Sequence, residues 1–366
     1  MKIADIRSHL VRLPYTTGSS GQWGDMMKWT TFDYVLLRVE TEDGIVGWGD
    51  AFGYGAAMAT KAAVDHIVAP GAIGMDARDI KGISHTLQQR HHLWGRHGVT
   101  LFAIGGLDIA LWDIAGKAAG LPLHRLLGGP RRLEIPAYAS LFKYQDPELV
   151  AERTRAALAD GFGLIKLHET GEAEVAAARE AAGDDVPIMI DTNCPWTPHQ
   201  AREMALRFKA YDPYWLEEPI FPPEDYASLA RLQAETGVPL AAGENACGAV
   251  EFQKMVEADA VSFLQPSVTK VGGVSEFLKI IALAEAQGAT VMPHCPYFGP
   301  GLLASLHLLS LLPDEALAEF FYYQTLEASL YGDAIRPVNG VMRVPTGPGL
   351  GLDPDPDVIR DYAAKD

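Results

Sequence analysis

The sequence predicts an α/β protein: a (β/α) barrel of the TIM type with an α+β domain in front of it. The main observation is a regular spacing: short apolar runs that end in a polar residue recur about every 25 residues in the second half of the chain. A strand and a helix of a parallel α/β unit together take roughly 20 to 30 residues. The residues that mark the strand ends are Lys166, Asp191, Glu217, Glu244, Ser267, His294 and Glu319.

Two absences from the sequence favour a barrel over an open, doubly wound sheet. The chain has no G-x-G-x-x-G and no G-x-x-x-x-G-K-[ST] motif, and such motifs form the phosphate loops of nucleotide-binding sheets. A barrel places its functional polar residues at the C-terminal ends of its strands, which is where the cadence has them. Nucleotide binding is therefore not expected.

The first 125 residues predict a separate α+β capping domain. Residues 1–50 contain the strand-like runs KIADIRSHLVRL, FDYVLLRVET and IVGWGDA, and the turn EDG joins the last two as a hairpin. Residues 56–120 become helical in period and end at Gly120 and Pro122. Strands first and helices second are typical of an α+β domain.

Three further segments complete the predicted domain organisation. Residues 15–30 are rich in glycine, serine and aromatic residues, which predicts a loop that closes over the site and carries specificity. The junction LLGGPRRLEIP leads into a barrel that we expect to span residues 126–335. The turn-rich segment 336–366 is expected to return to the capping domain.

Composition and charge exclude several kinds of partner. With 366 residues and 48% hydrophobic content, the chain can bury a barrel core and a second domain. A formal charge of -17 offers no basic footprint to nucleic acid or an anionic membrane, and we find no signal peptide or membrane-spanning segment. Three cysteines without a C-x-x-C pair suit a reducing cytoplasm. We expect a cytoplasmic homo-oligomer that acts on a small carboxylate substrate.

Three of the strand-end residues are acids on successive strands. Asp191, Glu217 and Glu244 close the runs IMID, YWLEEP and PLAAGE, so they can converge at one end of the barrel. Carboxylate oxygens form a hard site that suits Mg²⁺ better than Zn²⁺. The sequence therefore predicts one Mg²⁺ per chain.

Two histidines are candidates for proton transfer beside this metal. Lys166 and His168 share one face of their strand because side chains alternate, and histidine titrates close to neutral pH. His294 ends a strand roughly across the barrel, so the two histidines can flank a substrate from opposite faces. Asn193 is expected on the same face as Asp191, where it can bind substrate.

A series of motifs resembles the mandelate racemase and muconate lactonizing enzyme group of the enolase superfamily. The resemblance covers essentially the whole chain and implies an enolase-like modified barrel with an α+β cap and one Mg²⁺ held by the three acids. It also implies abstraction of a proton α to a carboxylate, giving an enediolate that the metal stabilises, a strategy for which this superfamily is itself a standard example. The motifs are GGLDIALWDIAGKAAGLPLHRLLGG at 105–129, the acids in IDTN, LEEP and GEN, TKVGG at 269–273, and PH at 293–294.

Two positions depart from the family pattern. The family commonly has a K-x-K pair on the second strand, whereas this chain has Lys166-Leu167-His168; His168 would then be the base, with Lys166 modulating it or meeting the substrate carboxylate. The family pairs its seventh-strand histidine with an aspartate, but Ser267 stands at that position. His294 should therefore be a weaker base, which favours a role as a proton donor, or a minor role, over a symmetric two-base racemase. Glu319 matches the eighth-strand acid that, when protonated, donates a hydrogen bond to the enediolate.

The leading hypothesis for function is a Mg²⁺-dependent lyase that dehydrates a small hydroxy acid or sugar acid to a 2-keto acid. The first alternative is an isomerase, a racemase or epimerase of a hydroxy or amino acid derivative. The second is a catalytically retired scaffold protein that retains its metal. Loop residues expected to meet substrate or line an apolar lid are Trp23, Met26, Met27, Trp94, Arg96, His97, Tyr297 and Phe298, with Asn193 and Ser267 as further substrate contacts.

Overall fold

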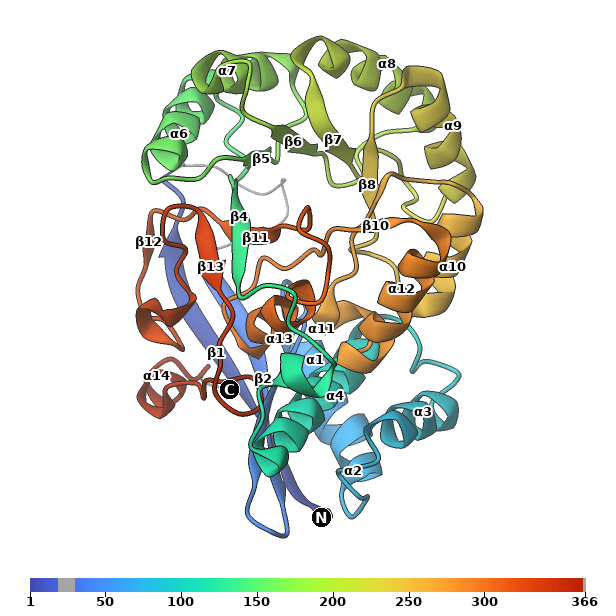
Figure 1. Cartoon of the computed structure of the whole chain (residues 1–366), viewed down its shortest axis with the longest axis vertical. Helices are drawn as coiled ribbons and strands as arrows, with labels where there is room; N and C mark the ends of the chain where they lie inside the picture. Colours follow the sequence, from blue (N-terminus) through green and yellow to red (C-terminus); the bar gives the residue numbers. More distant parts are fainter. Residues whose placement is uncertain (19–29, 365–366) are drawn as a thin grey trace.

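The computed structural model describes residues 1–18 and 30–364 and contains a barrel with a cap beside it (Figure 1). In the described residues, eight parallel strands form one curled sheet in the order β10-β9-β8-β7-β6-β5-β4-β11, and helices surround it (Figure 1). The predicted barrel is therefore confirmed. Its strands are β4 (Glu134–Ser140), β5 (Ile165–Leu167), β6 (Ile188–Asp191), β7 (Pro213–Glu217), β8 (Leu240–Ala242), β9 (Phe263–Leu264), β10 (Thr290–Val291) and β11 (Ala318–Phe321).

The outer helices begin at sites that the local sequence encodes. The carboxylate of Asp146 accepts the amide hydrogens of Glu148 and Leu149 at the start of α6. At the start of α8, Thr197 and Gln200 form a reciprocal capping box. The barrel helices are α6 (Pro147–Ala159), α7 (Glu172–Ala182), α8 (Pro198–Phe208) with a 3₁₀ turn at Lys209–Tyr211, α9 (Tyr226–Thr236), α10 (Ala249–Glu257), α11 (Val268–Val271), α12 (Val274–Gln287) and α13 (Pro300–Leu309).

The barrel closes between β10 and β11 through sulfur contacts. Among the described residues, no ladder of backbone hydrogen bonds joins these two strands. Instead, the Leu317 amide donates to Met292 Sδ at 3.2 Å and the Glu319 amide donates to Cys295 Sγ at 3.3 Å. Since His294 lies between the two sulfur residues in the chain, this seam runs beside the predicted active site.

An apolar plug fills the barrel interior beneath the strand ends. Its members come from several strands and include Tyr138 and Trp215, whose rings meet edge to face with centroids 5.9 Å apart. Residues two apart on a strand share a face. Three of the plug residues are followed by an acid two positions later, and these acids lie directly above the plug. These pairs are Met189 with Asp191, Trp215 with Glu217, and Leu317 with Glu319.

The cap is an antiparallel sheet, in the order β12-β1-β2-β3, covered by helices. Glycine allows α4 to lie directly on β3, because a Cβ at Gly49 would be 1.9 Å from the Gly106 carbonyl oxygen. The predicted α+β cap is therefore confirmed. Its elements are β1 (Ile3–Thr16), β2 (Thr31–Thr41), β3 (Val46–Ala51), α1 (Ala57–Ala63), a π-helical turn (Val64–Val68), α2 (Ala69–Ala72), α3 (Ile80–Arg90), α4 (Gly98–Ala119), the linker helix α5 (Leu123–Leu126) and β12 (Thr325–Leu326).

Helix α4 corrects one expectation about apolar segments. It has 22 residues and is apolar enough by length and composition to cross a membrane, although no such segment was expected. Its most apolar window is 72% buried inside the protein, where it packs on β3 and against α11. The apolar character of α4 is therefore explained by its place between cap and barrel.

The C-terminal segment contacts both the barrel and the cap. After a 3₁₀ turn at Gly332–Ile335, β13 (Val341–Arg343) pairs antiparallel with β4. Beyond α14 (Pro356–Asp361), the Arg12 amide donates to the Tyr362 carbonyl at 2.9 Å and the Ala364 amide to the Leu10 carbonyl at 2.8 Å. The end of the chain thus lies against β1, while the domain borders at 125 and 335 remain predictions.

Candidate active site and metal centre

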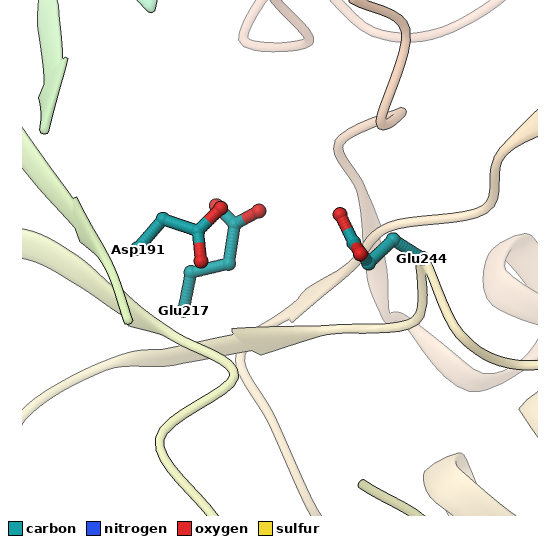
Figure 2. Close-up of side chains that lie close together, drawn as sticks. All are labelled: Asp191, Glu217 and Glu244. Carbon is teal, nitrogen blue, oxygen red and sulfur yellow. The ribbon is translucent and has the colours of Figure 1, made fainter. Parts of the chain in front are cut away.

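Three acidic side chains from neighbouring strands converge at the C-terminal end of the barrel (Figure 2). Asp191 ends β6, Glu217 ends β7 and Glu244 follows β8. One carboxylate oxygen of each lies within 4.8 Å of the others. Figure 2 shows Asp191 and Glu217 side by side, with Glu244 facing them across a gap. This arrangement can surround a single cation.

The chemistry of the three acids fits a hard divalent cation. They offer only oxygen ligands, which Mg²⁺ prefers. Burial, together with the neighbouring Asp191 carboxylate, raises the pKa of Glu217 well above its usual value. Burial would also raise the pKa of Asp191, but Lys166 and His168 hold it below its usual range. A bound cation would add to the positive charge that Lys166 places 2.7 Å from Glu217.

Lys166 is the centre of an ionic cluster beneath the three acids. Its completely buried Nζ lies 2.7 Å from Glu217 Oε1, 3.0 Å from Asp191 Oδ2 and 3.0 Å from Glu319 Oε1. Burial would lower the pKa of Lys166, but these carboxylates raise it well above its usual value. Lys166 is therefore an ammonium group that holds two of the predicted metal ligands in place, and it is unsuited to accept a proton.

Glu319 has one engaged oxygen and one free oxygen. Its Oε1 accepts hydrogen bonds from Ser140 Oγ at 2.8 Å and from Lys166. The buried Oε2 has no hydrogen-bond partner among the described residues, so it is available to a ligand. Burial would raise the pKa of Glu319, but Lys166 and the two histidines lower it. The protonated acid that the family resemblance implies is therefore not what this environment favours.

His168 is held by a main-chain carbonyl. Its Nδ1 lies 2.5 Å from the Leu141 carbonyl oxygen and its Nε2 lies 3.3 Å from Asp191 Oδ2. A carbonyl oxygen only accepts, so Nδ1 must carry a hydrogen. In the neutral ring, Nε2 is then the nitrogen that can take up a proton, and it faces the acid cluster.

His294 is held differently, by side chains on both of its ring nitrogens. Its Nε2 lies 2.8 Å from Glu244 Oε2, and its Nδ1 lies 3.3 Å from the Tyr297 hydroxyl. Tyr297 is in turn hydrogen-bonded to Ser267 Oγ. The position where the family has an aspartate is thus linked to His294 through a tyrosine.

Lys270 is a site residue to which the sequence analysis gave no role. Its Nζ lies 3.7 Å from Glu244 Oε1, donates to Asn245 Oδ1 at 3.1 Å and stands 4.9 Å from the centre of the Phe52 ring. The signal that could have found it is its place in TKVGG, three residues after the strand-end marker Ser267. A lysine so close behind a strand end can reach the neighbouring acid.

Two residues predicted to bind substrate are placed differently from the prediction. β6 ends at Asp191, and Asn193 lies beyond it in a left-handed conformation with φ 52°, so strand alternation does not position its side chain. Its amide instead donates to Asp191 Oδ1 at 3.0 Å. Arg96 is exposed and donates to Gln88 in α3 at 2.9 Å. Neither residue has a contact in the described structure that assigns it to substrate.

The residues predicted to line a lid also differ in their exposure to solvent. Tyr297 and Phe298 are only 3% and 1% exposed, so they belong to the packed interior behind His294 and not to a lid. Trp94 is 52% exposed. Trp23, Met26 and Met27 lie outside the described residues, so the lid over 15–30 remains a prediction.

Comparisons with known proteins agree with this geometry over the whole chain. Residues 25–128 match the mandelate racemase / muconate lactonizing enzyme N-terminal domain, and residues 148–358 match the enolase C-terminal domain-like family. The chain is 32% identical to D-galactarolactone cycloisomerase of Agrobacterium fabrum over 100% of both chains. It is also 32% identical to arabinonate dehydratase of Saccharolobus solfataricus over 91% of each. A solved racemase from Streptomyces coelicolor A3(2) with bound magnesium has a TM-score of 0.85 and 29% identity, covering 99% of this chain and 100% of that one.

Proposed function

Because the chain belongs to the mandelate racemase and muconate lactonizing enzyme group of the enolase superfamily, we propose that it removes the α proton of a small carboxylic acid with the help of one Mg²⁺. The most direct outcome is dehydration of a hydroxy acid or sugar acid to a 2-keto acid. One observation carries the proposal: each of two histidines contacts one member of the acid triad. His168 lies beside Asp191 and His294 beside Glu244.

The proposed cofactor site uses the convergent acids. Asp191, Glu217 and Glu244 would hold Mg²⁺, which supplies a positive charge that stabilises the negative charge developing on the substrate carboxylate as the α proton leaves. Lys166 keeps Asp191 and Glu217 in place through its ion pairs. Glu319 Oε2, which is buried and lacks a partner among the described residues, would accept a hydrogen bond from a substrate hydroxyl.

The two histidines divide the proton transfers. The bond from the α carbon to hydrogen breaks, its proton passes to Nε2 of His168, and its electron pair forms a double bond toward the carboxylate. The bond from the β carbon to its hydroxyl then breaks, and that hydroxyl leaves as water with a proton from His294. The enol product tautomerises to the 2-keto acid. A positioned acid or base of this kind contributes about 10² to 10⁴ in rate.

An isomerase is the second candidate, and one observation favours it. The full-length relative from Agrobacterium fabrum is named a cycloisomerase. If the group that leaves the β carbon stays attached to the same molecule, the same residues give an isomer in place of a dehydrated product. If a proton instead returns to the α carbon from His294, the product is an epimer. The retired-scaffold hypothesis loses support because the acid triad and both histidines are present together.

A single screen tests the proposed function and separates its variants. The purified protein with Mg²⁺ is incubated in D₂O with hydroxy acids, sugar acids and their cyclic forms, and proton NMR follows the α position. A 2-keto acid that carries deuterium at its β carbon, where the enol takes up a proton from solvent, supports a lyase, whereas an isomer without water loss supports the isomerase. If no compound of the panel shows either α-proton exchange or product, the proposal is contradicted.

We also propose the remaining features as expectations for this enzyme. The segment 1–125 would act as the cap, 126–335 as the catalytic barrel, and 336–366 as the returning segment that lies against β1. A homo-oligomer in the cytoplasm is proposed from composition alone. Size-exclusion chromatography with light scattering measures the oligomeric state.

A further inference from the structure

A second cavity lies outside the barrel mouth, between α6, the end of β11 and the C-terminal segment. Its volume is about 670 Å³, within the range of small-molecule sites. The Tyr322 hydroxyl, just after β11, donates to Asp160 Oδ2 at the end of α6 at 2.5 Å. A Cβ at Gly340, just before β13, would lie 2.6 Å from the Gly161 carbonyl oxygen. Among the described residues that line this cavity, none belongs to the acid triad and none is a histidine.

The wall of the cavity contains a guanidinium group that lacks a close acceptor. The side chain of Arg153, in α6, is only 13% exposed, and its buried Nε has no hydrogen-bond partner among the described residues. Its one ion pair among those residues is a 3.4 Å contact from Nη2 to Glu152, whose side chain is 63% exposed. Such an exposed partner contributes little, and a mostly buried charge destabilises a protein unless it is paired and hydrogen-bonded. An anionic oxygen in the cavity would supply the missing acceptor.

The other charged residues of the cavity leave Arg153 without this acceptor. Arg336 lies at the rim, where it is 59% exposed and 3.6 Å from Asp333. Asp333 is 92% exposed, and Asp160 accepts the Tyr322 hydroxyl. Neither acid has a contact with Arg153 among the described residues, so the positive charge at the inner end of the cavity is not neutralised by them.

Aromatic rings form the apolar part of the wall. Phe162 and Phe320 are 6% and 7% exposed, and their rings stack with centroids 6.0 Å apart. Tyr322 meets Phe162 edge to face at 5.8 Å, and the Tyr323 ring lies 5.7 Å from Phe320. Aromatic walls with a few polar groups are typical of sites for organic molecules, since flat rings pack against them.

We propose that this cavity binds a small organic anion, with a carboxylate or phosphate group at Arg153 and an apolar ring against Phe162 and Phe320. The planar guanidinium matches both oxyanions because each can accept two parallel N–H hydrogen bonds. Arg336 adds a second positive charge at the rim. The inference does not depend on the proposed function, because the reaction uses none of these residues.

Isothermal titration calorimetry of the full-length protein tests the proposal with four probes. Benzoate and phenyl phosphate carry both the ring and the oxyanion, benzyl alcohol lacks the charge, and acetate lacks the ring. Each titration is run with Mg²⁺ and again with EDTA, because binding at the metal centre would require the cation. We expect one saturable event that is the same in both buffers, with benzyl alcohol and acetate each roughly tenfold weaker or more. The tighter of the two aromatic anions identifies the preferred oxyanion.

Two variants assign this event to the cavity. Arg153→Gln should weaken binding roughly tenfold or more, whereas Arg155→Gln, at an exposed arginine of the same helix, should bind as wild type. Arg336→Gln should cause a smaller loss because this arginine is exposed, and it decides the matter if Arg153→Gln fails to fold. The proposal is overturned if neither aromatic anion gives a saturable event, if the event requires Mg²⁺, or if the folded arginine variants of the cavity bind as wild type.

Discussion

The two sides of the barrel mouth hold their histidines by different means. On the β5 side, His168 is fixed by the Leu141 carbonyl and borders an ionic cluster in which Lys166 contacts three carboxylates. On the β10 side, His294 is fixed by a hydroxyl chain through Tyr297. In both arrangements Nε2 faces a carboxylate oxygen, that of Asp191 at 3.3 Å for His168 and that of Glu244 at 2.8 Å for His294, so the two sides differ in the group that holds Nδ1.

The difference gives each histidine its own surroundings for the role proposed for it. On the β5 side, Lys166 and the carboxylates of Asp191, Glu217 and Glu319 are almost completely buried and paired with one another. On the β10 side, Glu244 and Lys270 carry charge near His294, but Tyr297, which contacts its Nδ1, is neutral and reaches the cap through the Phe52 and Tyr54 rings. A change in the cap can therefore reach His294, the proposed proton donor, while leaving His168, the proposed base, in place.

The largest effect should come from a residue on which both sides depend. Glu217→Ala removes a predicted metal ligand and an ion-pair partner of Lys166. We expect the loss of Mg²⁺-dependent thermal stabilisation and a fall of about 10³-fold or more in both exchange and product formation, since metal stabilisation contributes several kcal/mol. Differential scanning fluorimetry with and without Mg²⁺ measures the first effect. The matched control is Glu224→Ala, an exposed acid in the same loop; wild-type Mg²⁺ stabilisation in Glu217→Ala would remove Glu217 from the ligand set.

The next largest effect should come from a substitution that impairs the β5 side alone. His168→Asn removes the proposed base while keeping a group that can donate to the Leu141 carbonyl. Exchange of the substrate α proton with solvent should fall by about 10² to 10⁴, because proton abstraction comes first in every reaction proposed here. Proton NMR in D₂O measures it. Exchange at the wild-type rate would show that another residue is the base, although Lys166 is a poor candidate because its pKa is raised by three carboxylates that overcome the effect of burial.

A smaller and more selective effect should come from a substitution on the β10 side. His294→Asn should leave α-proton exchange measurable while product formation falls by about 10²-fold, because protonation of the leaving group follows proton abstraction. The ratio of exchange to product, taken from the same NMR samples, is the measurement. Equal losses in both would mean that His294 takes part before the leaving group departs, and the division of roles between the two sides would be wrong.

The strand ends were predictable because side-chain alternation is local. An acid two residues after a plug residue must share its face, so Met189 and Trp215 position Asp191 and Glu217 through the strand itself. The position of Ser267 could also be read from the strand cadence. The contact between Ser267 and the Tyr297 hydroxyl could not be predicted, because it depends on how the loop after β10 folds. An aspartate at position 267 would meet that hydroxyl, a contact that the sequence does not reveal.

The positions that local patterns describe least well are those whose contacts come from elsewhere in the fold. Asn193 was assigned by strand alternation, but the strand had already ended and the chain turned at a positive φ. The charge of Arg96 predicts a contact with substrate, yet its guanidinium donates to Gln88 in α3 of the cap. Lys166 was seen as a modulator of His168, but its three contacts come from strands far apart in the sequence. Such contacts depend on tertiary packing, which no local pattern encodes.

A second pair of histidines, outside the site, tests whether the predicted effects are specific to the two sides of the mouth. His124 Nδ1 and His307 Nδ1 are 2.9 Å apart and buried, and His307 Nε2 lies 3.2 Å from the Leu350 carbonyl. Burial lowers the pKa of His307 to about 4, whereas an unfolded histidine titrates near 6.5. Between these values the unfolded chain binds a proton at His307 that the folded protein does not. The contribution of His307 to the free energy of unfolding is therefore fully present above about pH 6.5 and is lost as the pH falls toward 4.

The full contribution of His307 to this loss is about 3 kcal/mol of unfolding free energy. His307→Asn should therefore be less stable than wild type at pH 7, because a buried hydrogen bond is lost, yet should lose less stability between pH 7 and pH 4.5. Urea denaturation at a series of pH values measures the difference, and His85→Asn, at an exposed histidine, should keep the wild-type profile. At pH 7 the ratio of α-proton exchange to product should stay at its wild-type value in His307→Asn. A changed ratio would mean that the balance between His168 and His294 responds to general loss of stability and not to the groups that hold each ring.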